Sequence, residues 1–244
     1  MVLEASRWRE LGQIAEQIAA VYDEACRLVV DDPELLEGFF GLTPYQTLMW
    51  NASAPLWHGI ARVDVFFTAD GPAITEINCD TPTGEAEAVE LGRIFGRRHP
   101  ELHDPNAQLP ARLLQMMDAA HRHLTHDAKG TIGLLYPTEF TDDLSLVRAY
   151  RRWFSAAERQ VVLGSPYNLG RNADGYLTLF DEPIGLMVRH YKTDWWGERA
   201  SVWTDESIPD VDPLVEPLRH LLGASVERRT AVLNPFGAVL TQNK

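Results

Sequence analysis

Two short runs of alternating apolar and polar residues constrain this chain most, because they flank a turn and so predict a β-hairpin. The runs are RVDVFFT at 62–68 and PAITEIN at 72–78, and Ala-Asp-Gly lies between them. A three-residue loop at 69–71, with Gly71 in the left-handed region, is a common way to close such a hairpin. The sequence therefore predicts two antiparallel strands with a tight connection.

The loop length decides which side chains share a face of this hairpin. With three loop residues, Asp64 lies opposite Glu76 and Arg62 lies opposite Asn78. A two-residue turn would instead place Asp64 and Glu76 on opposite faces. The longer loop gives the better apolar face, which then consists of Val63, Val65, Phe67, Ala73 and Ile77. We therefore expect four polar side chains on the other face.

Two carboxylates directly opposite each other destabilise a sheet unless a positive charge lies nearby. Arg62 can neutralise one of them, whereas a divalent cation would neutralise both. Asp, Glu and amide oxygens are hard ligands of the kind that Mg²⁺ accepts. The sequence following Thr81-Pro82 predicts a helix to about Arg97, whose N-terminus would favour an anion. The pattern is typical of a phosphate-handling centre; the alternative is a solvated hairpin face with an Arg–Asp pair.

Composition excludes several classes of protein. The 244 residues carry a formal net charge of −13, which argues against a nucleic-acid partner. No segment approaches the roughly 20 apolar residues of a membrane helix, and the start MVLEASRWRELG lacks the pattern of a signal peptide. Two cysteines form no disulfide framework. We expect no membrane association and a cytoplasmic location.

The rest of the chain predicts an α+β protein in two parts. The sequence pattern changes at Lys129-Gly130, from a predicted helix to a predicted buried strand, so we place a domain boundary between 1–129 and 130–244. The second part alternates strand, loop, helix and strand, which favours a small Rossmann-like, doubly wound α/β unit. Helices are expected at 4–31, 33–39, 82–97, 111–126, 142–157 and 212–222, and further strands at 131–136, 160–164, 176–180 and 184–191, with an aromatic-rich connector at 42–59.

Other groups of polar residues suggest additional sites. Glu139, Asp142 and Asp143 follow the strand at 131–136, where open α/β sheets bind ligands, and could hold a cationic amine such as a polyamine. Acids that favour a helix N-terminus are the alternative interpretation. Three histidines at 121, 123 and 126 occur on one predicted helix, but a structural role near its C-terminus is favoured over a metal site.

The hairpin region resembles the glutathionylspermidine synthase family, whose catalytic domain is a circularly permuted ATP-grasp. The resemblance rests on HGIARVDVFFTADGPAITEINCDTPTGEAEA at 58–88, which has an R-x-D strand followed by an E-x-N-x-D strand end. NPFGAVLTQNK at 234–244 is similar to the Asn-Lys-ending segment of that family, and YKTDWWGER at 191–199 is more loosely similar to its Lys-Thr-Trp stretch. The resemblance implies an ATP-grasp-like metal-site lobe followed by a pre-ATP-grasp α/β unit.

The resemblance also implies roles for individual residues. Asp64, Glu76 and Asn78 would bind Mg²⁺ with the ATP phosphates, and Arg62 would stabilise the transition state for acyl-phosphate formation. The resemblance further implies Thr81 and Thr83 as peptide-substrate contacts, and Lys244 as an ATP-binding residue at the point where the family continues into a further lobe. The amine substrate of the family would fit the acids Glu139, Asp142 and Asp143.

The resulting hypothesis is an ATP- and Mg²⁺-dependent carbon–nitrogen ligase that joins a small-molecule or peptide carboxylate to an amine through an acyl phosphate. The chain departs from the family in stopping at Lys244 and in having no glycine-rich phosphate loop. Two alternatives stay open. One is a non-catalytic module that binds a peptide or polyamine, and the other is a metal-dependent phosphohydrolase. The oligomeric state is left open.

Overall fold

The computed structural model describes residues 2–127, 130–138, 143–197 and 214–242, and the chain forms two compact units. Unit 1 consists of residues 1–82 together with 234–244, and unit 2 consists of residues 83–233. The division predicted at residue 129 differs from this one and stays a prediction. None of the helices in the described ranges is long and apolar enough to cross a membrane.

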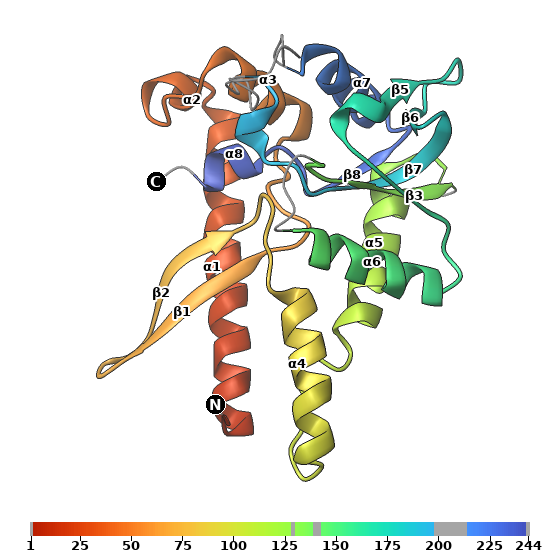
Figure 1. The fold of residues 1–244 in the computed structure, drawn as a ribbon. Coiled ribbons are helices and arrows are strands. Elements are labelled where there is room, and N and C mark those ends of the chain that lie inside the picture. The colour runs from red at the N-terminus through yellow and green to blue at the C-terminus, as the bar shows by residue number, and fades with distance from the viewer. Residues whose placement is uncertain (1, 128–129, 139–142, 198–213, 243–244) are drawn as a thin grey trace, which may run out of the picture. The chain divides into compact units, whose positions relative to one another are not determined.

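Unit 1 is helical apart from one hairpin (Figure 1). Its elements are α1 (Ala5–Asp31), α2 (Glu34–Gly38), α3 (Pro44–Ser53), β1 (Arg62–Thr68), β2 (Gly71–Asn78) and α8 (Ala238–Thr241). Helix α1 was expected from its helical spacing of apolar residues. Buried side chains from all three N-terminal helices pack with those from β2 and α8 in one core: Cys26, Val29, Leu36, Leu42, Trp50, Trp57, Ile77, Cys79, Ala238, Val239 and Leu240.

Helix α3 lies in the segment that the sequence analysis interpreted as a connector, and that interpretation was wrong. The Thr43 side chain accepts a hydrogen bond from the Gln46 backbone N–H at 3.3 Å, and the Gln46 side chain accepts one from the Thr43 N–H at 3.0 Å. Together with Pro44 at the first helical position, this capping box satisfies the first free backbone groups of the helix. The sequence analysis interpreted the segment by its aromatic residues and did not recognise the capping box that begins α3.

Unit 2 is built on a six-stranded sheet in the order β4-β3-β7-β6-β5, with β8 paired to β7. The pairs β3/β4, β3/β7 and β7/β8 are parallel, and β5/β6 and β6/β7 are antiparallel. The strands are β3 (Thr131–Leu135), β4 (Val161–Gly164), β5 (Leu169–Arg171), β6 (Leu177–Leu179), β7 (Glu182–Arg189) and β8 (Ala231–Leu233). The predicted strands correspond to β3, β4, β6 and β7, whereas β5 and β8 were not predicted.

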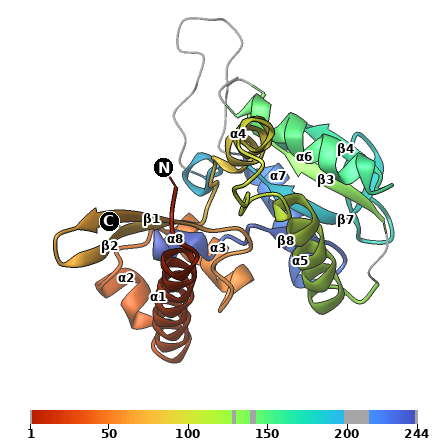
Figure 2. The ribbon, with the colours of Figure 1, turned by 90° about the horizontal axis from the view of Figure 1, so that it is seen from below.

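Helices cover both faces of the parallel strands in unit 2. They are α5 (Leu109–Leu124), α6 (Leu144–Ala156) and α7 (Val215–Val226), while α4 (Glu85–Arg98) packs against α6, and η1 (Pro166–Asn168) and η2 (Thr193–Trp195) are single turns. Helices α5 and α6 lie on one face of the sheet and α7 lies on the other (Figures 1 and 2). Because β3 has β4 on one side and β7 on the other, the chain reverses its direction of winding at β3.

Helix α4 begins later than predicted. Its N-cap is Gly84, with φ of 109°, and its first residue is Glu85 rather than Pro82. Gly84 adopts a left-handed backbone conformation that a residue with a side chain would rarely adopt, so the chain turns there before the helix starts. The predicted Thr81 N-cap was wrong.

Candidate functional site

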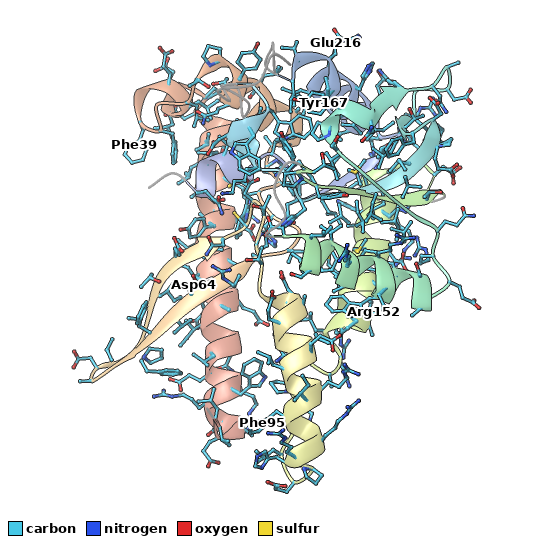
Figure 3. All side chains as sticks on the ribbon, in the orientation of Figure 1. Phe39, Asp64, Phe95, Arg152, Tyr167 and Glu216 are labelled. Carbon is cyan, nitrogen blue, oxygen red and sulfur yellow. The ribbon has the colours of Figure 1, made fainter. Side chains whose placement is uncertain are left out.

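The polar face of the β1–β2 hairpin is the candidate site, and it has the predicted pairing. Asp64 pairs with Glu76, and Arg62 pairs with Asn78. Asp64 is labelled on the hairpin in Figure 3. Both strands are antiparallel as expected, so all four side chains belong to one face at the end of the hairpin away from the turn.

The loop that gives this register differs from the predicted three-residue loop. Thr68 pairs with Gly71, so the loop contains only two residues, Ala69 and Asp70. A bulge then adds one residue to β2, because Asp64 pairs with Glu76 whereas Val65 pairs with Ile74. Gly71 has the positive φ that was expected, at 117°. The two-residue loop and the bulge together give the same pairing at the polar end as a three-residue loop.

The apolar face of the hairpin is divided between a buried end and an exposed tip. Ile77 is 4% exposed and Val63 packs against the same core. Phe67, which was expected on the core face, is 44% exposed, and Arg7 lies over its ring at 5.4 Å. Burial is therefore concentrated beneath the four polar side chains, and the prediction of a continuous core face was wrong for Phe67 and for Ala73, which is also exposed.

Hydrogen bonds join the four polar side chains. Arg62 donates to both Asp64 oxygens, from Nε to Oδ1 at 2.7 Å and from Nη2 to Oδ2 at 3.1 Å. Asn78 Nδ2 donates to Asp64 Oδ2 at 3.3 Å and to Glu76 Oε1 at 3.2 Å. The two carboxylates therefore lie within hydrogen-bond reach of one amide group. The four polar side chains that the sequence analysis grouped lie together in the structure.

The electrostatics of the face favour the ionised form of Asp64. The hydrogen bond from Arg62 is the main reason that the pKa of Asp64 lies below its ordinary value; burial opposes this shift, and the Arg62 charge reinforces it. The bidentate geometry is the strong form of an arginine–carboxylate contact. Asp64 consequently carries a negative charge at neutral pH and can act as an acceptor only.

The residues present fit a hard divalent cation by their chemistry. Asp64 and Glu76 supply carboxylate oxygens, and Asn78 supplies an amide oxygen when its side chain turns over. Among the described residues, no group of three or more His, Cys, Asp or Glu side chains could hold a metal ion. Two carboxylates are therefore the charged part of this donor set, and the amide of Asn78 is needed to complete it.

The predicted substrate-binding and ATP-binding residues fall partly outside the described ranges. Glu139, Asp142 and Lys244 lie outside them. Thr81 and Thr83 are half-buried, in unit 1 and unit 2 respectively. Their roles as substrate contacts stay predictions, as does the role of the polar face itself.

Asp143 is the described member of the predicted amine-binding group, and it contacts a residue that the sequence analysis missed. It precedes α6 without capping it, and its Oδ2 lies 3.1 Å from Nε2 of His190, which is 6% exposed. This contact is the main reason that the pKa of Asp143 lies below its ordinary value, with burial opposing and the Lys192 charge assisting. Only the parallel pairing of β3 with β7, which brings their carboxyl ends together, could have identified His190.

Comparison with known proteins gives a match of fold. No protein-family model matches the sequence, and no curated protein matches it significantly. The structure is similar to that of a glutathione synthetase-like effector from Globodera pallida in its apo form, with a TM-score of 0.61 at 13% sequence identity. The match covers 97% of this chain and 54% of the effector, so the chain spans about half the length of that protein. The chain has the mixed α+β fold of the matching part of the effector.

Proposed function

We propose that the chain is an ATP- and Mg²⁺-dependent carboxylate–amine ligase of the ATP-grasp type, related to the glutathionylspermidine synthases. One observation carries the proposal: two carboxylates, an amide and a guanidinium lie within hydrogen-bond reach on one hairpin face. The fold shared with a glutathione synthetase-like effector supports the ligase class at a coarse level. A buried core beneath the face holds it in place.

The reaction that we propose has two steps. A substrate carboxylate oxygen attacks the γ-phosphorus of ATP, which releases ADP and forms an acyl phosphate. The amine nitrogen then attacks the acyl carbon and loses a proton, and phosphate leaves as the amide bond forms. Asp64, Glu76 and Asn78 would hold the Mg²⁺, which supplies charge neutralisation for the phosphates.

Arg62 would stabilise the negative charge that develops on the transferred phosphoryl group. Its guanidinium donates to both oxygens of Asp64, which places it beside the carboxylates that would hold the metal. The remaining residues keep their predicted roles in this proposal: Thr81 and Thr83 toward the carboxylate substrate, Glu139, Asp142 and Asp143 toward the amine, and Lys244 toward ATP.

Calorimetry with a non-hydrolysable ATP analogue tests this function. We expect the wild-type chain to bind the analogue only when Mg²⁺ is present. The substitutions Asp64→Asn and Glu76→Gln should each remove this dependence, because each deletes one of the two negative charges. Asp70→Asn is the matched control, since Asp70 is exposed at the tip of the same hairpin, and it should bind like wild type.

Two outcomes would contradict the ligase. Equal analogue binding by the Asp64→Asn and Asp70→Asn variants would show that the polar face does not take part. Binding of Mg²⁺ without any binding of the analogue would leave a metal site and remove the ligase. ATP hydrolysis that requires both a carboxylate and an amine is the corresponding activity to measure once binding is established.

A further inference from the structure

The chain returns to unit 1 at Asn234, far along the sequence from the hairpin, and this residue is almost completely buried. It is 3% exposed. Its Oδ1 accepts hydrogen bonds from the backbone N–H of Gly59 at 3.1 Å and of Ile60 at 2.6 Å. Its Nδ2 donates to the backbone carbonyl of Asp80 at 2.9 Å. One side chain therefore binds three backbone groups.

The positions of these backbone groups relate Asn234 to the candidate site. Ile60 lies two residues before Arg62, where β1 begins, and Asp80 lies two residues after Asn78, where β2 ends. Asn234 thus joins the segment that enters the hairpin to the segment that leaves it. The amide side chain has both an acceptor and a donor, and it uses the acceptor on one segment and the donor on the other.

Residues 234–242, here called the return segment, make further contacts with the rest of unit 1. The backbone N–H of Phe236 donates to Ser53 Oγ at 3.0 Å, and Thr241 Oγ1 lies 2.8 Å from Cys79 Sγ. At Gly237 an added Cβ would lie 1.9 Å from the carbonyl oxygen of Leu56, so the backbones are in close contact. Movement of Asn234 relative to the hairpin ends is therefore restricted.

We propose that Asn234 is a positioning residue for the polar face. It acts through its three backbone hydrogen bonds, which fix the separation of the two strand ends from which Arg62 and Asn78 project. The part of this inference that concerns a cation rests on the proposed function. The part that concerns the backbone of the hairpin ends does not.

The test measures both parts on the full chain. Asn234→Ala removes all three hydrogen bonds, and we expect faster exchange of the Gly59 and Ile60 amides and about tenfold weaker binding of Mg²⁺, a loss typical of groups that hold metal ligands in place. Asn234→Asp keeps the acceptor oxygens and loses the donor to Asp80. In that variant the Gly59 and Ile60 amides should stay protected, which also keeps the test decisive if the alanine variant does not fold.

Thr230→Ala is the matched control in unit 2. Thr230 is 1% exposed, and its Oγ1 accepts from the Leu177 N–H at 3.3 Å and donates to the Ile184 carbonyl at 2.7 Å. Like Asn234, it joins two backbone segments, so its loss should reduce stability without changing Mg²⁺ affinity.

The outcomes separate the two proposals. Unchanged amide exchange at Gly59 and Ile60 in Asn234→Ala would overturn the positioning role. Equal weakening of Mg²⁺ binding by Asn234→Ala and Thr230→Ala would also overturn it, because general destabilisation would then explain the effect. Absence of Mg²⁺ binding by the wild-type chain, with faster amide exchange in Asn234→Ala, would remove the metal site and leave the backbone role established.

Discussion

The side chain of His121 on α5 is 1% exposed, and its Nε2 has no hydrogen-bond partner within the parts of the chain that the structure describes. Burial is the main cause that lowers its pKa, and the charge of Arg159 acts in the same direction while Asp118 and Asp127 oppose it. His121 is consequently a neutral ring packed inside unit 2. Burial in unit 2, and not the residue type, keeps the His121 ring uncharged.

We expect the stability of the chain to depend on pH through His121. The folded-state pKa lies below the unfolded value of about 6.5, so the unfolded chain binds more protons between the two values. The free energy of unfolding should therefore decrease as the pH falls below about 6.5. His121→Gln should reduce this decrease, measured by urea denaturation at pH values above and below it.

His123 on the same helix provides the control for this prediction, because it is exposed. His123→Gln should leave the pH dependence of stability as in wild type. If the two glutamine variants show the same dependence on pH, burial of His121 does not have the effect inferred for it.

At the scale of elements, two Thr-Pro dipeptides show what decides a helix start. Thr43-Pro44 begins α3, and Gln46 at the third helical position completes a capping box. Thr81-Pro82 has Gly84 at the equivalent position, and the helix begins after that glycine. The residue three positions beyond the threonine therefore distinguishes the two, and a prediction from Thr-Pro alone selects the wrong one.

Substitution of the two threonines tests this distinction. Thr43→Ala should lower the free energy of unfolding by about 1 kcal/mol, because the Gln46 N–H loses its acceptor. Thr81→Ala removes no helix cap and should have a smaller effect. Chemical denaturation of both variants measures the difference, and a larger loss for Thr81→Ala would be inconsistent with the capping argument.

The polar face could be predicted from sequence because side chains alternate along strands. Parity alone requires Asp64 and Glu76 to share a face if the apolar residues are to share the other. The turn and the bulge could not be predicted, since a two-residue loop with a bulge and a three-residue loop give the same pairing at the polar end. Strand β6 has three residues and was predicted because it lies within the longer run YLTLF at 176–180. Strands β5 and β8 also have three residues each, but no such run surrounds them, so they show no period.

Contacts across the fold lie beyond what the sequence pattern can give. His190 meets Asp143 only because β7 pairs with β3, and Asn234 meets Asp80 only because the chain returns to unit 1. Neither residue has a neighbour in sequence that marks it. The resemblance of 234–244 to a known segment predicted a role for Lys244. The structure instead indicates a role for Asn234, the first residue of this segment.

For the whole molecule, the two compact units provide separate cores. Unit 1 takes its core from two distant parts of the sequence, and unit 2 is continuous from Thr83 to Leu233. Leu240 of the return segment is 5% exposed in the unit 1 core, and Leu186 of β7 is 1% exposed in unit 2. Replacement of either by alanine should lower stability by about 2–5 kcal/mol.

We expect the two leucine variants to affect different regions. In Leu240→Ala, backbone amides of α1, α3 and the hairpin should exchange faster, while those of β3 and β7 should stay protected. Leu186→Ala should have the opposite pattern. Hydrogen exchange measured across the chain distinguishes these results from a uniform loss of protection in both variants, which would mean that the units unfold together.

The discontinuity of unit 1 has a consequence for the nascent chain. During translation the hairpin strands leave the ribosome early, but Asn234 follows Asp80 by 154 residues. The continuous unit 2 can fold in that interval, whereas the strand ends of the hairpin must wait until Asn234 has been made. Assembly of the polar face is therefore expected to follow the folding of unit 2.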